Sequence, residues 1–308
     1  MLFIYRNRSS AKGVANIYAI CPGDSTPRMV TYGDNYNRWP RWSPDRSQIA
    51  CLSKSSGLTQ LHIMDRDGGN DRQLISDSDL DAEGVYLLPD GSREFVELIW
   101  LPEGDQVAVA LRGYEELIWQ TVDVETGEIT PPEDLVLPSS KSVWSMSISH
   151  DGSRIAYTIL TNPEETESPV EIFIQNLDGS APYQLTSTGW RIGKPVWSPD
   201  DNQIAFLSSS EYSSDQYPNN PIQNDIYIIN LDERDLHEPV LTNLHPYRIA
   251  WSPDGKSLAV IAGEMVPTGE LNTPELMLKT LYVLNIKFGE KRELFKALAP
   301  DDIMDLSW

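Results

Sequence analysis

Side chains that could do acid–base or metal chemistry are scattered through this sequence and do not form a known motif. No H-E-x-x-H metal motif and no G-x-S-x-G nucleophile elbow occurs. Two acidic runs, residues 77–83 (D-S-D-L-D-A-E) and residues 163–167 (P-E-E-T-E), could offer oxygen ligands to calcium, but neither has the spacing of a known calcium loop. We interpret both runs as solvated charge, and we expect no metal site and no cofactor. The histidines are far apart in the chain: His62, His150, His237 and His245.

Carboxylates offer a catalytic alternative. Two of them at the right separation could act as general acid and base in a sugar lyase or hydrolase. Asp34 and Asp305 are the candidates, because each lies near the start of a segment that is predicted below to be an inner strand. Sequence spacing does not define the distance between two such side chains, so the enzyme remains the alternative hypothesis.

Aromatic and basic residues form the second candidate site. They recur just before the apolar runs that open successive repeats, in a chain with a formal net charge of −22. Tyr, Trp and Arg are enriched at the energetic centres of protein interfaces, so this group predicts a binding surface. The alternative is that the aromatic rings pack between structural units while the arginines pair with nearby carboxylates. The predicted binding residues are Tyr36, Arg38, Trp39, Trp144, Trp190, Arg191, Tyr247 and Arg248.

A repeated turn sets the positions of these residues. W-S-P-D-G at 251–255 recurs as W-S-P-D-R at 42–46 and W-S-P-D-D at 197–201, with weaker copies W-L-P-E-G at 100–104 and I-S-H-D-G at 148–152. Proline at the second position of the turn, an Asp side chain and a glycine that accepts the left-handed conformation predict a tight hairpin. The copies lie 48 to 58 residues apart, which is typical of a solenoid, a propeller or an array.

Each repeat contains four strand-like runs, which is the content of one propeller blade. The chain opens with the second strand of a unit at residues 2–6 and ends with a first strand at residues 303–308. Joining these two partial units gives six blades, with the ring closed by three strands plus one. We therefore predict an all-β, six-bladed β-propeller of four-stranded antiparallel blades, formed by residues 1–308 as a single domain.

The repeat resembles that of a known family. W-S-P-D-D is followed by an I-A-F strand at 204–206 and a D-I-Y-I segment at 225–228, and D-R-D-G occurs at 65–68. This pattern resembles the TolB-type six-bladed propeller repeat, which is also similar to repeats in the propeller domains of prolyl-oligopeptidase-like peptidases. The resemblance covers the whole chain and departs at Leu101 and Glu103 in one turn and at Ile148 and His150 in the next.

The resemblance implies an envelope interaction scaffold, or a sensor or partner domain of a larger envelope protein. It implies an extracytoplasmic setting, in the periplasm or at the cell surface. Propeller lyases of similar fold hold a metal with clustered histidines, and the separated histidines of this chain do not match that arrangement.

Composition narrows the choice of partner. The net charge of −22 would repel the phosphates of nucleic acids and of anionic membranes. No apolar run approaches the roughly 20 residues that span a bilayer, and no signal peptide follows Met1 in the chain as given. We expect no nucleic-acid partner, no membrane insertion and a monomer.

Cys21 and Cys51 lie in predicted strands of different repeats and are expected to be free, buried thiols.

Propeller topology divides the links between two faces. The repeated turns and the D-x-D-G links lie on one, the short-turn face. The links between second and third strands and between blades lie on the other, the long-loop face, and include residues 209–224 and 263–277. Loops on a rigid scaffold usually carry binding. We therefore predict non-catalytic binding of a protein, a peptide or an envelope polymer such as a polysaccharide, at the long-loop face and the mouth of the central channel.

Overall fold

All regular structure in the described part of the chain is β-strand. The computed structural model describes residues 1–308 except 8–13, 56, 81–84, 86, 89–92, 133–134, 141, 163–167, 210–224, 233–239, 241–243, 267–275 and 298–301. Several predicted features, including His237, the acidic run 163–167 and most of the two longest links, lie outside the described residues. Within the described ranges, no helix has the length and apolar character needed to cross a membrane.

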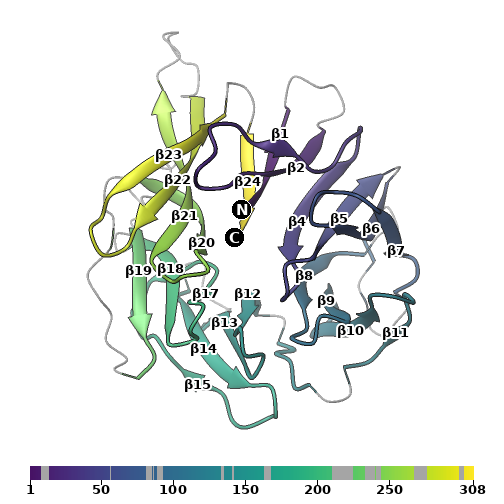
Figure 1. The fold of residues 1–308 in the computed structure, drawn as a ribbon. Coiled ribbons are helices and arrows are strands. Elements are labelled where there is room, and N and C mark those ends of the chain that lie inside the picture. The colour runs from purple at the N-terminus through teal and green to yellow at the C-terminus, as the bar shows by residue number, and fades with distance from the viewer. Residues whose placement is uncertain are drawn as a thin grey trace.

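Antiparallel pairing gathers the strands into blades arranged around a centre (Figure 1). Blade 1 contains β24 (Asp302–Ser307), β1 (Leu2–Arg6), β2 (Ala15–Ala19) and β3 (Arg28–Met29). Blade 2 contains β4 (Tyr36–Trp42), β5 (Gln48–Ser55), β6 (Leu58–Asp65) and β7 (Arg72–Ser76). Blade 3 contains β8 (Phe95–Trp100), β9 (Gln106–Arg112), β10 (Leu117–Asp123) and β11 (Ile129–Thr130).

The remaining strands follow the same order. Blade 4 contains β12 (Val143–Ile148), β13 (Arg154–Leu160), β14 (Val170–Asn176) and β15 (Tyr183–Gln184). Blade 5 contains β16 (Arg191–Ile192), β17 (Val196–Trp197), β18 (Gln203–Ser209) and β19 (Asp225–Asn230). Blade 6 contains β20 (His245–Trp251), β21 (Ser257–Val266), β22 (Leu276–Asn285) and β23 (Lys291–Lys296). The predicted all-β architecture is confirmed. The count of six blades stays a prediction, because the outer strand expected near residues 239–242 falls largely outside the described residues.

Strands from the two ends of the chain close the ring. β24 pairs antiparallel with β1 in the register Leu2↔Ser307, Phe3↔Leu306 and Tyr5↔Ile303. The inner strand of blade 1 therefore comes from the last residues, as the three-plus-one arrangement predicts. Figure 1 shows the N- and C-terminal ends close together near the centre of the ring.

Three of the repeated tryptophans join neighbouring blades. Each buried indole N–H donates to a carbonyl on the inner strand of the preceding blade. The bonds run from Trp100 to Arg41 (3.0 Å), from Trp197 to Ser147 (2.9 Å) and from Trp251 to Val196 (3.1 Å). These three side chains therefore pack between neighbouring blades, whereas Trp42 and Trp308 are half-buried.

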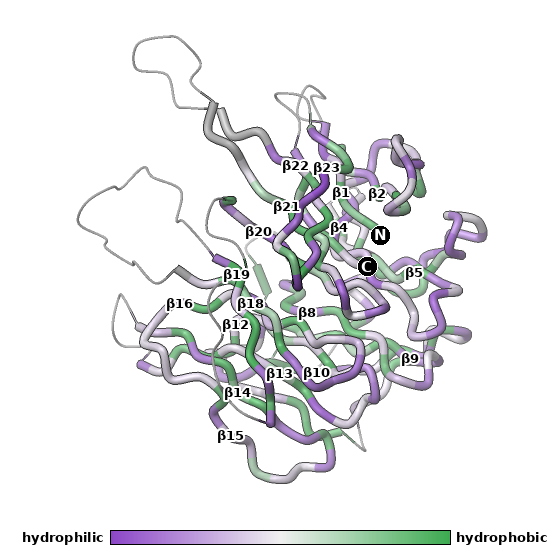
Figure 2. The backbone as a smooth tube through the Cα atoms, turned by 60° about the vertical axis from the view of Figure 1, so that its left-hand side comes forward, coloured by the Kyte–Doolittle hydropathy of each residue, from purple (hydrophilic) through white to green (hydrophobic). Residues whose placement is uncertain are grey.

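Hydrophobic cores lie between adjacent blades. The residues of β5 alternate: Ala50 and Leu52 pack toward Val109 of blade 3, while Ile49 packs toward Ile4 of blade 1. A strand that is buried on both faces loses the simple alternation of apolar and polar residues. Figure 2 shows hydrophobic residues recurring along the strands and hydrophilic residues at many of the turns.

Side-chain hydrogen bonds fix the repeated turns. In four of them a Ser hydroxyl donates to the Asp two residues later and accepts the backbone N–H five residues later. The pairs, at 2.6 to 2.7 Å, are Ser43–Asp45, Ser149–Asp151, Ser198–Asp200 and Ser252–Asp254. The turn of blade 3 has Leu101 in place of the Ser and keeps its backbone bonds. The departure from the repeat removes a side-chain bond and leaves the turn intact.

Successive turns also touch one another on the short-turn face. A Cβ added to Gly152 would lie 1.9 Å from Cγ of Pro102, so the glycine of one turn faces the proline of the turn before it. A Cβ on Gly255 would similarly lie 3.4 Å from Cγ of Pro199. Compared with W-S-P-D-G, the turn of blade 4 has His150 in place of the proline, and the turn of blade 5 has Asp201 in place of the glycine. These two residues are in contact.

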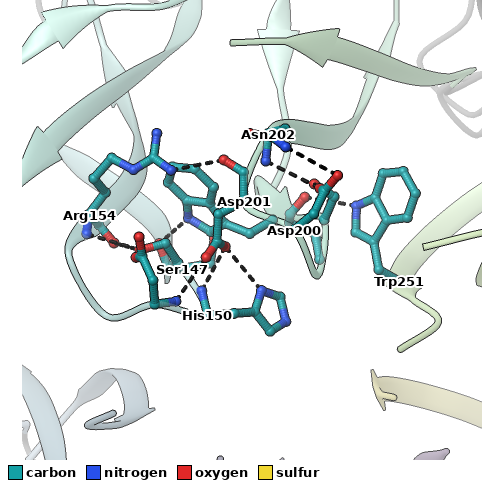
Figure 3. Close-up of polar contacts among 12 residues, drawn as sticks. Ser147, His150, Arg154, Asp200, Asp201, Asn202 and Trp251 are labelled. Atoms are coloured by element: carbon teal, nitrogen blue, oxygen red, sulfur yellow. Dashed lines mark hydrogen bonds and ion pairs between the residues drawn. The ribbon is translucent and has the colours of Figure 1, made fainter. Parts of the chain in front are cut away.

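Asp201 binds the turn of blade 4 (Figure 3). Its Oδ1 accepts the backbone N–H of His150 at 2.7 Å and faces Nδ1 of that histidine at 3.2 Å. Its Oδ2 accepts the backbone N–H of Asp151 at 2.8 Å. Arg154 donates to the carbonyl of Asp201 at 2.9 Å and lies over the ring of Trp197 at 4.8 Å. These contacts offset the strain of the left-handed φ of 56° at Asp201.

The two cysteines differ. Cys51 is a free thiol buried in β5, as predicted, and its burial raises the pKa of the thiol. Cys21 is also free but exposed, so the prediction of a buried thiol in a strand was wrong for this residue. β2 ends at Ala19, and the backbone N–H of Cys21 donates to Oδ2 of Asp24 at 3.2 Å, which starts the turn toward β3.

Arg46 and Asp201 occupy equivalent left-handed positions, with φ of 59° and 56°, and allow a paired test. Arg46→Gly should change the free energy of unfolding by less than about 1 kcal/mol, because relief of backbone strain is opposed by the added entropy of glycine and by loss of a long hydrogen bond to the carbonyl of Trp308 (3.5 Å). Asp201→Gly should lower it by about 2 kcal/mol, because two backbone N–H groups lose a charged acceptor. Urea unfolding measures both, and equal effects would contradict the role given to the Asp201 carboxylate.

The turn aspartates should make stability sensitive to acid. Hydrogen bonds, above all from Ser43, lower the pKa of Asp45 from 3.8 to about 2. Hydrogen bonds, above all from Ser149, likewise lower the pKa of Asp151 to about 2. Because these folded-state pKa values lie below the unfolded one, their stabilisation is present above about pH 4 and is lost as the pH falls toward about 2. Asp151→Asn should flatten the dependence of the urea midpoint on pH in that window, and an unchanged slope would refute this.

Candidate functional site

The predicted binding residues lie at or near the beginnings of inner strands. Tyr36, Arg38 and Trp39 are on β4, Trp144 is on β12, Trp190 directly precedes β16, Arg191 opens β16, and Tyr247 and Arg248 are on β20. Because the repeated turns follow the ends of the inner strands, these beginnings lie at the opposite end of each blade. The residues therefore belong to the long-loop face.

Arg38 and Trp39 form a strained pair. The guanidinium of Arg38 lies 5.0 Å from the centre of the Trp39 ring. Trp39 has a left-handed φ of 52°, and the register of β4 with β5 shifts between Arg38 and Arg41. The extra residue of this bulge redirects the Trp39 side chain onto the core between blades 2 and 3. Burial lowers the pKa of Arg38, although Tyr36 and Glu94 favour its charged form.

Trp144 of β12 and the half-buried Arg191 of β16 form a pair on the inner strands of blades 4 and 5. The guanidinium lies 5.2 Å from the centre of the Trp144 ring. Trp144 is 54% exposed, whereas Trp100, Trp197 and Trp251 of the repeated turns are buried. The arginine covers one face of the ring, and the remaining surface is available to a partner.

The other predicted binding residues make packing, hydrogen-bond or cation–ring contacts within the protein. Trp190 packs on the core of blades 4 and 5, with its ring centre 5.2 Å from that of Tyr227. The hydroxyl of Tyr36 donates to Sδ of Met304 at 3.6 Å. Nζ of Lys279 lies 5.1 Å from the Tyr247 ring, whose pKa is raised by burial and by Asp302.

Arg248 is exposed and donates to the carbonyl of Tyr247 at 2.8 Å. The predicted set is thus distributed around the ring as local pairs, and only part of it presents an accessible surface.

Sequence analysis did not identify a charged cluster that joins four blades through their inner strands. Arg41 of β4 lies 3.4 Å from Oε1 of Glu97 on β8 and 3.5 Å from Oδ2 of Asp305 on β24. Nζ of Lys194, just before β17, lies 2.5 Å from Oε2 of Glu97. Lys194 belongs to blade 5 and Glu97 to blade 3, so this bond reaches past blade 4.

Neighbouring charges of opposite sign act against the effect of burial on the pKa values of Glu97 and Arg41. Burial by itself would raise the pKa of Glu97, but Lys194 and Arg41 outweigh it and the pKa is lowered. Burial would lower the pKa of Arg41, but Asp305 and Glu97 raise it. Burial, together with Arg41, lowers the pKa of Lys194. A carboxylate held in this way is a fixed anion and a poor proton donor.

A positional signal could have identified most of this cluster. Glu97, Lys194 and Asp305 each lie three residues before the Trp that anchors their repeat. Arg248 occupies the same position before Trp251. Arg41 lies directly before Trp42, after the bulge of β4, so this positional signal does not reveal its partnership with Glu97 and Asp305.

The carboxylates proposed for catalysis have different environments. Asp34 is exposed in the link before β4, whereas Asp305 has a side chain that is 14% exposed and bonds Arg41. Glu97 and Asp305 are brought together through Arg41, and both face cations. This arrangement supports a structural ion-pair network more than an acid–base pair.

Histidines and acidic residues form pairs in the described part of the chain. Nδ1 of His62 lies 2.8 Å from Oδ1 of Asp71, and His150 faces Asp201. Among the described residues, no group of three His, Cys, Asp or Glu side chains could hold a metal ion.

Exposed hydrophobic side chains concentrate on the long-loop face. Five of the seven large ones that the described residues expose lie in links or strand beginnings on that face. They are Tyr32 (74% exposed), Leu58 (44%), Leu87 (47%), Tyr114 (63%) and Trp144 (54%). Phe288 lies in the turn between β22 and β23 on the short-turn face. Val136, in the link between β11 and β12, also lies at the short-turn face, because its backbone N–H donates to the carbonyl of Leu177 in the turn after β14. The long-loop face therefore combines exposed rings with the cations of the inner strands.

Glu97→Gln tests the charged cluster. The substitution should lower the free energy of unfolding by about 3 to 5 kcal/mol, because it leaves Lys194 and Arg41 partly buried beside a neutral amide. Glu103→Gln, in an exposed turn, is the matched control and should change it by less than about 0.5 kcal/mol. Chemical denaturation measures both, and similar small effects would contradict the structural role of the cluster.

No family model matches the chain. Among curated proteins, the uncharacterized peptidase YuxL of Bacillus subtilis is 27% identical over 204 residues, which make up 65% of this chain and 25% of YuxL. The Tol-Pal system protein TolB of Ruthia magnifica is 32% identical over 85 residues, which make up 26% of this chain and 20% of that protein. The chain thus matches a quarter or less of the length of these relatives.

Solved structures match nearly the whole chain. TolB from Acinetobacter baumannii has a TM-score of 0.69 at 14% identity, over 100% of this chain and 65% of that one. A putative TolB from Agrobacterium tumefaciens has a TM-score of 0.60 at 16% identity, over 96% and 88%. An oligogalacturonate lyase in complex with manganese has a TM-score of 0.51 at 15% identity, over 97% and 73%. With its antiparallel blades closed by both ends of the chain, this protein has a β-propeller fold similar to that of the TolB structures.

Proposed function

We propose that the chain is a non-catalytic binding scaffold that holds a protein or peptide at its long-loop face and channel mouth. The observation that carries this proposal is the concentration of exposed large hydrophobic side chains on that face. Exposed aromatic residues grouped on one side of a rigid scaffold are typical of interaction surfaces.

The pair formed by Trp144 and Arg191 is the centre of the proposed interface. A cation over the ring holds the indole in place, so less side-chain entropy is lost when a partner binds. The ring offers a large apolar contact area, and exposed Arg248 on β20 adds a charged donor on the same face. A partner that presents apolar groups with nearby carbonyl or carboxylate oxygens would complement these side chains.

The biological setting follows from the same proposal. TolB-like relatives support a protein partner and an extracytoplasmic location, in the periplasm or at the cell surface. We propose that residues 1–308 form a single propeller domain, acting as a monomer or as a sensor or partner domain of a larger envelope protein. A polysaccharide is the other polymer that such a face could hold.

Fewer observations support a catalytic role than support binding. The relatives named as a peptidase and as an oligogalacturonate lyase make a propeller enzyme the second hypothesis. Its best residues are Glu97 and Asp305, which share Arg41. Because Lys194 and Arg41 keep the pKa of Glu97 low, and Arg41 also forms an ion pair with Asp305, the arrangement suits a structural ion-pair network better than acid–base chemistry, and we favour binding.

A paired substitution tests the proposed interface. Trp144→Ala combined with Arg191→Ala removes an exposed ring and its cation from the long-loop face. The matched control is Lys287→Ala combined with Phe288→Ala, because Nζ of Lys287 also lies over an exposed ring, at 5.6 Å, but on the short-turn face. Both variants, and the native chain, would be immobilised and exposed to envelope and soluble fractions of the source organism.

A partner identified on the native chain would then be purified, and its Kd measured for all three proteins. The long-loop variant should weaken binding by about 30-fold or more, which corresponds to a hot spot of about 2 kcal/mol. The short-turn control should bind like the native chain. Equal binding by all three proteins, with each shown to be folded, would overturn the assignment of the interface.

A further inference from the structure

A buried carboxylate holds the link that carries the chain to Arg191. Glu171 lies on β14 and is only 3% exposed. Within the described part of the chain it forms no ion pair with a Lys, Arg or His side chain. A carboxylate is costly to bury unless hydrogen bonds satisfy its oxygens, so the partners of Glu171 indicate what it does.

The side-chain partners of Glu171 all belong to the link between β15 and β16. Oε1 accepts the backbone N–H groups of Thr188 at 2.8 Å and of Gly189 at 2.7 Å. Oε2 accepts the hydroxyl of Thr186 at 2.5 Å. Hydrogen bonds to a charged acceptor are roughly twice as strong as neutral ones, so the carboxylate holds residues 186–189 against β14.

The same network reaches the two residues that follow. The Thr188 hydroxyl lies 3.3 Å from Oε1 of Glu171 and accepts the backbone N–H of Trp190 at 3.1 Å. The carbonyl of Trp190 accepts the N–H of Val170 at 2.9 Å, and Arg191 then pairs with Val170 where β16 meets β14. The hydrogen bonds of the Glu171 carboxylate therefore fix the backbone from which the Arg191 side chain extends.

Blade 1 has an equivalent link that lacks the charge. Thr31 accepts the N–H of Ile17 at 2.9 Å and donates to Oδ1 of Asn16 at 3.2 Å. This matches the pair formed by Thr186 and Glu171 in blade 4. Among the described residues, however, Oδ1 of Asn16 accepts only side-chain groups. The contacts to backbone N–H groups of the link therefore come with the carboxylate of blade 4 and are not common to both blades.

We propose that Glu171 is a positioning residue, whose carboxylate sets the link so that the guanidinium of Arg191 lies over the Trp144 ring. The two groups are 5.2 Å apart. At 3% exposure, Glu171 acts through Arg191 and not by touching a partner. The importance of this pair for binding rests on the proposed function, whereas the geometry is tested on the chain alone.

The stacked pair reports its own geometry. Protons that lie over an aromatic ring resonate upfield of their usual positions, so the side-chain signals of Arg191 report its contact with Trp144. The full chain would be labelled with ¹³C and ¹⁵N at arginine, and the Arg191 signals assigned with Arg191→Lys. In Glu171→Gln these signals should move downfield, toward those of exposed arginines. An amide nitrogen cannot accept a hydrogen bond, so one of the two oxygen positions is lost whichever way the amide points.

Hydrogen exchange reports the hydrogen bonds to the link. The amides of Thr188 and Gly189 should exchange about tenfold faster or more in Glu171→Gln, because they lose a charged acceptor. Thr188→Val is the second variant and keeps the carboxylate, but it removes the hydroxyl that accepts from Trp190. It should move the Arg191 signals in the same direction by a smaller amount.

Gln175→Leu is the matched control. Gln175 is a buried polar side chain on the same strand, and its Nε2 donates to the carbonyl of Val136 at 2.7 Å. The substitution should lower the stability and leave the Arg191 signals in place. The same result for Glu171→Gln, a lower stability with unchanged Arg191 signals, would show a merely structural role and overturn the proposal.

Binding separates this proposal from the proposed function. The Kd of a partner captured on the native chain should rise between about twofold and tenfold for Glu171→Gln, because the released guanidinium must be ordered on binding. Arg191 signals that move without a change in Kd would uphold the positioning role and count against the proposed interface. Arg191 signals that stay in place in both Glu171→Gln and Thr188→Val would overturn the positioning role, whatever the Kd.

Discussion

Backbone pairing between β1 and β24 is the constraint on which the rest of the structure depends. A propeller buries its blades against one another, and a blade without its inner strand would expose unpaired N–H and C=O groups at the centre of the ring. The same strand carries Asp305, which bonds Arg41, and Met304, which accepts from Tyr36. Closure therefore positions the charged cluster that joins the inner strands and part of the long-loop face.

The inner strands serve stability and recognition with different residues. Their ends carry tryptophans that donate to the preceding blade, and a cluster linking Arg41, Glu97, Lys194 and Asp305 fixes the strands from within. Near their beginnings, Trp39 and Trp190 are used for packing, whereas Trp144 and its arginine stay accessible. A rigid ring of this kind can present a few aromatic side chains in fixed positions, which suits binding more than acid–base chemistry.

Features of the fold that depend on short sequence patterns could be predicted, whereas contacts between blades could not. The turns, the strand runs and the closure follow from short patterns that recur around the chain, and even the turn with Leu101 keeps its geometry. The bond from Lys194 to Glu97 joins blades that are not adjacent, and no local pattern encodes that distance. The contact between His150 and Asp201 also depends on how neighbouring blades are placed in the ring. Each of these residues departs from the repeated turn, and the two turns belong to different blades. Among the predicted binding residues, residue type alone did not distinguish the exposed Trp144 from the packed Trp39 and Trp190.

Hydrogen exchange of the chain with and without its captured partner tests the central claim most directly, because it maps the contact surface without substitution. The account predicts slower exchange on binding in the amides at the beginnings of β12, β16 and β20 and in the links of the long-loop face. The repeated turns should exchange at the same rate in both states. Protection confined to those turns, or absent from the long-loop face, would contradict the account.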